Sequence, residues 1–392
     1  MLDIWPSFPL TVHYGEHLGR SVDNIVAALE CADRVCHIDL GVMGVSDFDI
    51  FLAAMQQPFP ELTDLKFFSY DETAAVDPDS FLGGSAPRLE FLHFSRIRFP
   101  GLPKLLLSVT HLVYLLLHNI PHSGYISPDR MVAALSALTS LEYLSLGFES
   151  PRSCPDPASR GPPPKTRSVL PVLTYLSFKG VSEYLDDFVA CIDAPQLNTL
   201  DITFFNDIVF DTPQLVQFIS RTPMSKALGK AYITLQDRAV RVEFSSQTSR
   251  RGLFKVEILC RGLDWQVSSL EQVCTSCLPP LSILEDLYFN EVPHSPPDWK
   301  DSVESRQWLE LFRPFMAVKN LYLSENFASS IAPALQELVE DRTTDVLPAL
   351  QNIFLKGLDS SGSDRVQESI GQLVAAQQVA NHPIGISPWT DL

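Results

Sequence analysis

Leu112-Val113-Tyr114-Leu115-Leu116-Leu117 contains the phrase Leu-x-x-Leu-x-Leu, which returns at residues 141–146 and, with valine at its first position, at residues 318–323. Apolar residues two apart point to the same face of a strand, so each copy predicts a short strand with one buried side. A strand of this length cannot bury that side alone. The phrase therefore predicts a stack of similar neighbouring strands.

The phrase recurs along nearly the whole chain. Indexed by its fourth position, it has twelve copies over 315 residues, and the eleven steps between them average about 29 residues. Steps of this size lie at the long end of the range for leucine-rich repeats. Ala231 and Val256 are the weakest copies, and Leu10 and Ile384 extend the series in phase towards the two ends. The index residues are Ile38, Leu65, Leu92, Leu115, Leu144, Leu176, Leu200, Ala231, Val256, Leu287, Leu321 and Ile353.

Helical patterns lie between the strands. Apolar residues three and four apart mark one buried helical stripe, and Ser21 is placed to cap a helix that starts at residue 22. Strand, helix and strand in a fixed phase give a parallel sheet with helices on its other side. The sequence therefore predicts an α/β leucine-rich-repeat solenoid over residues 1–392, a horseshoe with parallel strands on the concave face and helices on the convex face. Helical connectors are predicted at residues 131–138, 184–190, 213–220, 270–277, 308–312, 334–339 and 366–379.

Two segments interrupt the repeat. Residues 149–171 hold seven prolines, and because proline fixes φ and lacks an N–H donor, we expect an extended loop inserted between two repeats. Between Ala231 and Val256, the segment Val240-x-Val242-x-Phe244 alternates with polar residues, which predicts a strand out of phase with the series. A local antiparallel excursion and two regular repeats are equally compatible with this pattern.

Composition and charge exclude several classes of function. The formal net charge of −18 and the pI near 4.8 provide no basic footprint for nucleic acid, since a nucleic-acid-binding surface must neutralise phosphates. Seven scattered cysteines predict reduced thiols in an intracellular protein, cytoplasmic or nuclear, and no signal peptide is readable. The most apolar window, residues 105–120, is short and interrupted by polar residues, so we expect no membrane partner.

No arrangement of residues predicts an enzyme. Cys274-Thr275-Ser276-Cys277 has the C-x-x-C spacing of a zinc or redox site, but a structural zinc site needs a second pair of ligands, which the sequence does not offer at suitable spacing. Asp186 and Asp187 are adjacent, so on a helix they point in different directions, and we interpret them as part of a solvated helix face. No nucleotide-binding or hydrolase motif occurs. We therefore expect no catalytic residue, no metal and no cofactor.

The residues that alternate with the buried leucines point to the concave face of the predicted solenoid. Aromatic residues recur there at equivalent positions, which predicts columns of rings roughly 4.8 Å apart. Aromatic residues are enriched in binding hot spots and concave solenoid faces commonly bind partners, although rings can also merely stabilise strand pairing. His37 and Lys66 lie on the same face. The predicted protein-binding residues are Phe91, Tyr114, Tyr143 and Tyr175, just before the index position, and His93, Tyr232, Tyr288, Tyr322 and Phe354, just after it.

Several repeats share a proline-containing lead-in to the strand. The lead-ins are Phe59-Pro60-Glu61-Leu62, Ala86-Pro87-Arg88-Leu89, Ala194-Pro195-Gln196-Leu197 and Leu347-Pro348-Ala349-Leu350. Together with Leu263-Asp264-Trp265 and Leu278-Pro279-Pro280-Leu281, they make the sequence resemble the fungal, basidiomycete-type F-box proteins with leucine-rich repeats, over essentially the whole chain. The resemblance implies repeats that select a protein for ubiquitination while an N-terminal F-box docks a Skp-type adaptor. No F-box precedes the first repeat in residues 1–392, which leaves docking of that adaptor open: the chain is a fragment, a shortened gene model or a relative without an F-box.

These observations predict a non-enzymatic module that binds another protein through its concave face. The resemblance adds substrate recognition in an F-box-type ubiquitin ligase. A structural scaffold would instead bury the aromatic columns, and a hydrolase on a repeat scaffold would need a nucleophile and a base that converge in a pocket. Little chain precedes the first strand, which leaves no room for a capping element, so we expect an upstream segment.

Overall fold

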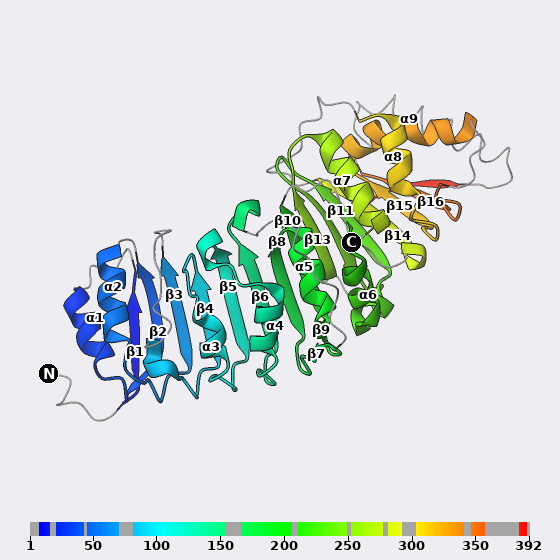
Figure 1. Cartoon of the computed structure of the whole chain (residues 1–392). Helices are drawn as coiled ribbons and strands as arrows, with labels where there is room; N and C mark the ends of the chain where they lie inside the picture. The colour runs from blue at the N-terminus through cyan, green and yellow to red at the C-terminus, as the bar shows by residue number, and fades with distance from the viewer. Residues whose placement is uncertain are drawn as a thin grey trace. The chain divides into compact units, whose positions relative to one another are not determined.

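The computed structural model forms two compact units, residues 1–198 and residues 199–392, each with its own strands and helices (Figure 1). Strands and helices alternate along most of both units. The described residues are 8–15, 21–42, 45–69, 81–153, 166–205, 211–248, 252–276, 281–291, 303–340, 346–356 and 384–389.

The described strands of the first unit form a parallel sheet. In spatial order they are β1 (Leu10–Tyr14), β2 (Val35–Val42), β3 (Asp64–Ser69), β4 (Phe91–Ser95), β5 (Tyr114–Ile120), β6 (Tyr143–Phe148) and β8 (Tyr175–Gly180). Two shorter strands, β7 (Ser168–Val169) and β9 (Ile192–Asp193), pair with each other outside this sheet. Each strand of the main sheet thus lies beside the strand of the next repeat, as a stack of repeats requires.

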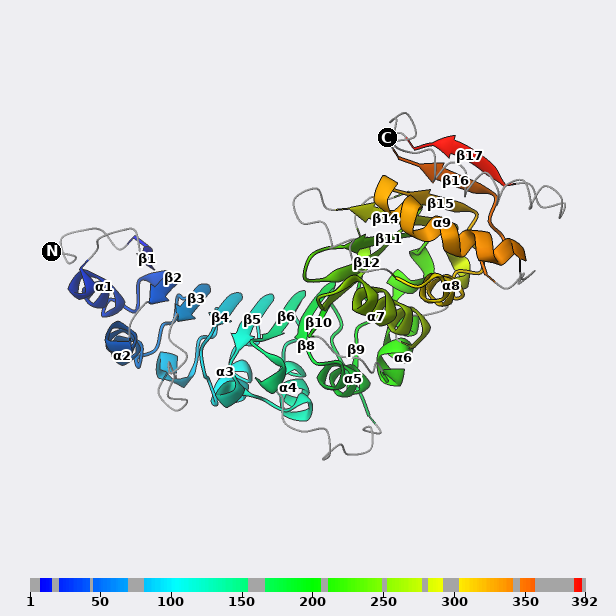
Figure 2. The ribbon, with the colours of Figure 1, turned by 90° about the horizontal axis from the view of Figure 1, so that it is seen from above.

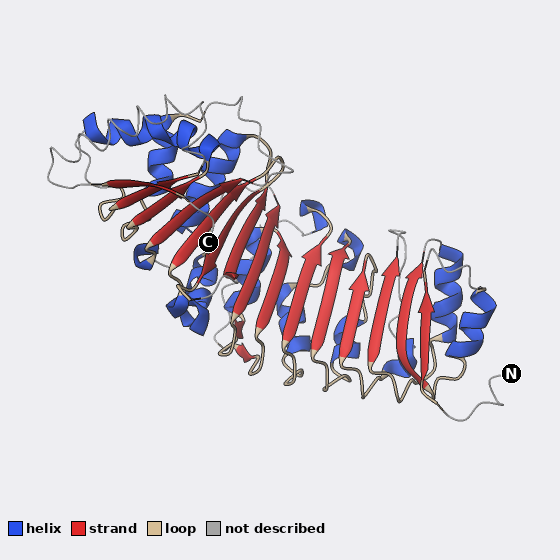
Figure 3. Cartoon of the chain, turned by 180° about the vertical axis from the view of Figure 1, so that it is seen from behind, coloured by secondary structure: helices blue, strands red, loops and turns tan. Residues whose placement is uncertain are grey.

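The helices of the first unit lie on one face of its sheet (Figures 2 and 3). Ser21 occupies the N-cap position of the first helix, but its side chain makes no capping hydrogen bond, so the helix start is correct and the predicted cap is wrong. The opposite face carries no described helix, and we call it the open face. The helices are α1 (Val22–Leu29), α2 (Val45–Ala54), α3 (Leu102–Leu106), α4 (Pro128–Leu135) and α5 (Ser182–Ala190).

A tight turn leads into many of the strands. The N–H of Leu62 donates to the carbonyl of Phe59 at 3.3 Å, and the N–H of Leu89 donates to the carbonyl of Ala86 at 3.1 Å. Both ends of each turn are buried, and a proline at the second position suits such a turn because its φ is preset. The proline-containing lead-ins are therefore turns that anchor the start of the strand in the core.

The sheet of the second unit contains an antiparallel meander. In spatial order its strands are β10 (Thr199–Phe205), β13 (Gly252–Leu259), β12 (Val240–Ser245), β11 (Lys230–Leu235), β14 (Asp286–Glu291), β15 (Asn320–Leu323), β16 (Asn352–Leu355) and β17 (Gly385–Pro388). Strand β12 runs antiparallel to both of its neighbours, while the other pairs in this unit are parallel. The alternating segment around Val242 is therefore an antiparallel excursion, and the alternative of two regular repeats is wrong.

The helices of the second unit also lie on one face of their sheet (Figure 2). They are α6 (Pro213–Arg221), α7 (Leu263–Ser276), α8 (Ser305–Phe312) and α9 (Glu325–Glu340). Helices α7 and α9 are longer than the predicted connectors at 270–277 and 334–339. The predicted helix at 366–379 and most of the proline-rich segment, residues 154–165, lie outside the described residues. Parallel strands on one layer and helices on the other confirm the α/β repeat fold class in each unit.

The index residues form a buried row along each sheet. In the first unit the row is Ile38, Leu65, Leu92, Leu115, Leu144 and Leu176, and each of these side chains is 0% exposed. In the second unit the row is Leu200, Phe254, Phe244, Ala231, Leu287, Leu321 and Ile353. The repeated phrase is thus the core of both units, and the row continues unbroken through the meander.

Three predicted positions in this row are wrong by two residues. The residues that hold the row are Val12, Phe254 and Ile386 in place of Leu10, Val256 and Ile384. Strands β1 and β13 carry apolar residues at alternating positions, and a shift by two keeps the same face towards the core. On β17, Ile386 is in register with the row but is 38% exposed, whereas Ile384 is buried. The side-chain pattern therefore does not determine which of the two residues lies in the row. The backbone pairing between strands determines it.

Candidate protein-binding surface

Four aromatic side chains form a column on the open face of the first unit. We call Phe91, Tyr114, Tyr143 and Tyr175 the first column. Strand register places them at equivalent positions on β4, β5, β6 and β8. Each immediately precedes a buried index residue, so the alternation of side chains along a strand turns it to the open face.

The rings of the first column are unequally spaced. Phe91 and Tyr114 have ring centroids 5.9 Å apart, as do Tyr114 and Tyr143, and both pairs are tilted. Tyr143 and Tyr175 stack at 4.3 Å with an interplanar angle of 5°. Tyr114 is 42% exposed. The middle of the first column therefore presents aromatic surface to solvent.

A second column lies on the open face of the second unit. It consists of Tyr232, Tyr288, Tyr322 and Phe354, which are register partners on β11, β14, β15 and β16. Successive ring centroids are 4.5, 4.1 and 4.5 Å apart, and the interplanar angles are 14°, 10° and 10°. The second column is therefore a continuous parallel stack.

Further contacts hold the second column in place. The ring of Trp389, just after β17, lies 6.0 Å from that of Tyr288 and 5.7 Å from that of Tyr322, and the ammonium of Lys356 lies 5.3 Å from the Trp389 ring. Burial, followed by a hydrogen bond donated to Tyr322, raises the pKa of Tyr288. Burial also raises the pKa of Tyr322. These rings are covered and bonded from within the unit.

A polar ladder accompanies the second column on the same strands. The amide of Asn352 donates to the side-chain oxygen of Asn320 at 2.8 Å, and the amide of Asn320 donates to Asp286 at 2.7 Å. Asp286 is buried, so its carboxylate needs the hydrogen bond that Asn320 supplies. This ladder ties three neighbouring strands together beside the stacked rings.

Two histidines meet on the open face of the first unit. His93 on β4 and His118 on β5 approach each other with 3.2 Å between Nε2 and Nδ1. The second nitrogen of His118, Nε2, lies 2.9 Å from the hydroxyl of Ser145 on β6. The ring of Phe68 on β3 contacts His93 edge-to-face at 4.6 Å. The structure thus joins one predicted site residue, His93, to two residues that the sequence analysis did not select.

Positive charge surrounds this pair of imidazoles. Burial, then His118, then Lys66 lower the pKa of His93 to about 4, and burial together with Lys179 lowers the pKa of His118. Lys66 is the register partner of His93 on β3, and its ammonium also lies 5.3 Å from the ring of Phe91 in the first column. Both imidazoles are therefore neutral at pH 7 beside fixed positive charge.

Ser145 and His118 have the hydrogen bond of a nucleophile and its base, so the hydrolase alternative needs a chemical test. Ester or amide hydrolysis also requires donors for the oxyanion. Strand β6 lies between β5 and β8, and its N–H groups are used in the ladder to those strands. The Ser145 side chain is only 5% exposed. The Ser145 hydroxyl is therefore poorly accessible, which disfavours acyl transfer at this residue.

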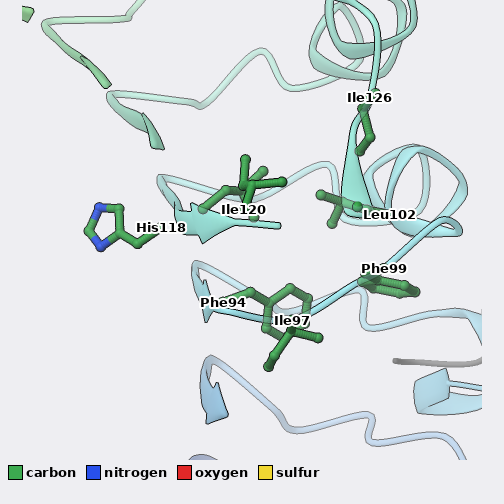
Figure 4. A pocket seen from close by; sticks show the side chains of 9 residues that line it. Phe94, Ile97, Phe99, Leu102, His118, Ile120 and Ile126 are labelled. Atoms are coloured by element: carbon green, nitrogen blue, oxygen red, sulfur yellow. The ribbon is translucent and has the colours of Figure 1, made fainter. Parts of the chain in front are cut away.

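An apolar cavity near the ends of β4 and β5 does not change this conclusion. Figure 4 shows the imidazole of His118 directed away from the apolar side chains on the other side of the strand. Because the hydroxyl of Ser145 does not line the cavity, a substrate bound there would not meet it. The lining residues are Phe94, Ile97, Phe99, Leu102, Leu117, His118, Ile120, Gly124 and Ile126.

The remaining candidates from the sequence form no site. Cys274 is buried and in no disulfide with a described cysteine, and Cys277 lies outside the described residues. Asp186 is 4% exposed, so its assignment to a solvated helix face is wrong; it lies in the middle of α5 on the buried side, with Leu185 and Val189. Among the residues that the structure describes, no three histidine, cysteine or acidic side chains gather as metal ligands. In the same part of the chain, no helix has the length and apolarity to cross a bilayer.

Comparison with known proteins assigns no family. No family model matches the sequence, and no curated protein matches it. A solved leucine-rich-repeat-containing protein, LegL7 from Legionella pneumophila, matches with a TM-score of 0.32 and 13% identity, over 85% of this chain and 97% of that chain. A likeness at this score carries no argument, so the fold rests on the strand register and the function on the site itself.

Proposed function

We propose that this chain is a non-enzymatic repeat module that binds another protein through the open faces of its sheets. The observation that carries the proposal is the first column, where aromatic rings at equivalent positions stand on a face without a described helix. Tyr114 is 42% exposed there. Rigid aromatic side chains bury a large area at a small cost in conformational entropy, which is why they are common hot spots.

His93 and the first column form the foremost contact surface in this proposal. Strand backbone holds the rings in fixed positions, so little ordering is needed when a partner binds. The second column, Tyr232, Tyr288, Tyr322 and Phe354, offers a further contact surface at its exposed edges. Its contacts with Trp389 also favour a supporting role within its own unit. The scaffold alternative therefore applies to the second column more than to the first.

The resemblance to F-box proteins with leucine-rich repeats suggests what the bound protein undergoes. In this proposal the module is the substrate-recognition part of an F-box-type ubiquitin ligase adaptor. The lead-in turns, such as Phe59 to Leu62, are the residues that carry the resemblance, and they belong to the core. A Skp-type adaptor remains a proposed partner only through an F-box supplied outside residues 1–392.

The binding test compares the first column with an equally exposed apolar surface. The test variant is Tyr114→Ala/Tyr143→Ala/Tyr175→Ala, and the control is Ile50→Ala/Leu107→Ala. Ile50 and Leu107 lie on the helix side and are 43% and 58% exposed. Proteins captured by cross-linking in cells that express the chain are quantified for each variant, and the affinity of each enriched partner is then measured after purification.

We expect the test variant to bind the partner at least about tenfold more weakly, because one hot-spot aromatic residue contributes roughly 2 kcal/mol. The control variant should bind as the wild type does. Equal affinities for all three proteins would contradict the proposal. For the ubiquitin ligase role, the partner should carry less ubiquitin in cells that contain the test variant, and unchanged ubiquitination would remove this part of the proposal alone.

A further inference from the structure

Imidazoles on the open face of the first unit have two different kinds of neighbour. At the start of the sheet each faces a carboxylate: His13 lies 3.4 Å from Asp39, and His37 lies 3.8 Å from Asp64. On β4 and β5 the pattern changes, and His93 faces His118 instead. Among the residues that the structure describes, these two imidazoles therefore have no carboxylate partner, unlike His13 and His37.

Charge is equally uneven there. Lys66 is flanked in register by His93 on one side and by Asp39 on the other, but the carboxylate of Asp39 pairs with His13. Among the described residues, no carboxylate lies within 4.0 Å of the Lys66 ammonium, which rests against the ring of Phe91. Within the described part of the chain, Lys66 thus makes no ion pair beside the imidazole pair, although the protein has a net charge of −18.

We propose that Lys66 and His93, with the His93 ring held in place by His118, bind a carboxylate side chain of the protein partner. This inference rests on the proposed function and specifies its chemistry: the partner presents an acidic residue next to an aromatic residue that lies on the first column. Lys66 and His93 stand on neighbouring strands, roughly 4.8 Å apart, so both can donate to one carboxylate. The protein's overall negative charge opposes such a ligand only weakly, because salt screens charges beyond about 8 Å.

The hydrogen-bonded chain makes the site responsive to protons. A neutral imidazole carries one N–H, so the contact between His93 and His118 uses the proton of one of the two rings. If His118 donates to His93, its other nitrogen accepts from the Ser145 hydroxyl, and the second nitrogen of His93 carries a hydrogen that can be donated outward. A bound carboxylate favours this arrangement. Protonation of His93 would make both of its nitrogens donors and strengthen binding further.

The direction of the pH effect follows from linkage. Burial and neighbouring positive charge keep His93 neutral in the free protein, with a pKa of about 4, and an adjacent carboxylate raises the pKa of an imidazole. The complex therefore holds more protons than the free protein at mildly acidic pH. Affinity should rise as the pH falls from about 7.5 to 5.5, until the ligand's own carboxylate starts to protonate near pH 4.3.

Two short peptides test the site. Acetyl-Gly-Glu-Tyr-Gly-amide carries one carboxylate, and acetyl-Gly-Gln-Tyr-Gly-amide is its neutral counterpart. Binding to the full chain is followed by NMR of isotope-labelled histidine rings, with His93→Gln and His118→Gln to assign the signals. Lys66→Met removes the cation and keeps most of its aliphatic stem, and Lys226→Met is the matched control, since Lys226 is exposed on a turn away from the strands.

The glutamate peptide should bind at least about tenfold more tightly than the glutamine peptide at pH 6, as expected for a charge-assisted hydrogen bond. The preference for the glutamate peptide should become smaller in Lys66→Met and stay unchanged in Lys226→Met. In His93→Gln, this preference should no longer depend on pH. Equal binding of the two peptides, or a preference that survives in both Lys66→Met and His93→Gln, would overturn the inference. Failure of both peptides to bind at millimolar concentration would also overturn it. The proposed function is tested separately, by the affinity of the tyrosine variants for the full-length partner, so it can hold even if the peptides do not bind.

Discussion

The two aromatic columns occupy related positions on their strands but differ in how they are held. Neighbouring rings of the first column are 5.9, 5.9 and 4.3 Å apart, whereas those of the second are 4.5, 4.1 and 4.5 Å apart. Trp389 covers part of the second column, and Tyr288 and Tyr322 are joined by a hydrogen bond. The rings of the second column therefore contact one another and Trp389, whereas the first column leaves ring surface exposed to solvent.

This difference explains why a repeated aromatic position is ambiguous evidence. Stacked rings on neighbouring strands stabilise a sheet whether or not they bind anything. What separates the two roles is the surrounding structure: the cover from Trp389, the ladder from Asp286 to Asn352, and the exposure of Tyr114. We therefore propose that the first column chiefly recognises a partner and that the second chiefly stabilises its sheet.

The largest expected effect is on stability in the second column. Tyr288→Ala removes a ring that contacts Tyr232, Tyr322 and Trp389, so we expect it to lower the free energy of unfolding by about 2–4 kcal/mol. Tyr114→Ala, at the exposed middle of the first column, should cost less than about 1 kcal/mol. Denaturant unfolding of both variants measures the difference. Equal losses would contradict the division of roles.

A smaller effect should follow from removing the cover. Trp389→Ala deletes two ring contacts and the contact with the Lys356 ammonium, which together are worth about 1–2 kcal/mol. Thermal unfolding should show a lower midpoint, and quenching by iodide should show the tyrosines of the second column more accessible. Trp265→Ala is the control, because Trp265 is 48% exposed on α7. An unchanged unfolding midpoint in Trp389→Ala would contradict the stabilising role of Trp389 in the second column.

Acid should weaken the first unit through its imidazole pair. The folded-state pKa of His93 is lowered from 6.5 to about 4, so above pH 6.5 the folded and unfolded states hold the same number of protons on this residue. Below pH 6.5 the unfolded state binds more protons, and the stability that neutral His93 contributes is lost as the pH falls through about 4. His93→Gln should flatten the stability profile between these values, as measured by urea unfolding. A profile that keeps its full slope in His93→Gln would contradict this assignment.

The smallest effect is expected at alkaline pH in the second unit. The pKa of Tyr288 is raised by burial and by its hydrogen bond to Tyr322, so its contribution to stability is complete below the unfolded-state value of about 10. As the pH rises above 10, the unfolded state releases a proton that the folded state keeps, and stability falls. Tyr288→Phe should reduce this alkaline loss relative to its own stability at pH 8. A loss identical to that of the wild type would contradict the assignment.

Sequence pattern located most of the fold but not its register. The buried rows around Leu115, Leu144 and Leu321 follow from the repeated phrase, and the out-of-phase strand around Val242 follows from clean alternation. Val256 illustrates the limit. It and Phe254 are both buried and lie two residues apart on β13, so only the backbone pairing with β10 places Phe254 in the row. A two-residue shift keeps every side chain on its face and is therefore invisible to the pattern.

Only part of the candidate site could likewise be predicted from the sequence. Phe91, Tyr114 and Tyr143 could be selected because each stands next to an index residue. His118 and Ser145 could not, because the contacts of His118 with His93 and with Ser145 run diagonally between different positions on neighbouring strands. The histidines at 13, 37, 93 and 118 look alike in the sequence, and only their spatial neighbours separate those that face a carboxylate from those that face each other.

The sequence by itself determined that this protein is built from stacked strands and helices, because apolar residues at fixed intervals leave no other way to bury one side of each strand. It also determined which faces carry the aromatic side chains, because strand alternation is local. Only the tertiary structure decided which column is covered and which is open, and which imidazoles lack carboxylate partners. Those properties depend on contacts between residues far apart in the chain, such as Tyr288 with Trp389 and His93 with His118, and no local pattern encodes them.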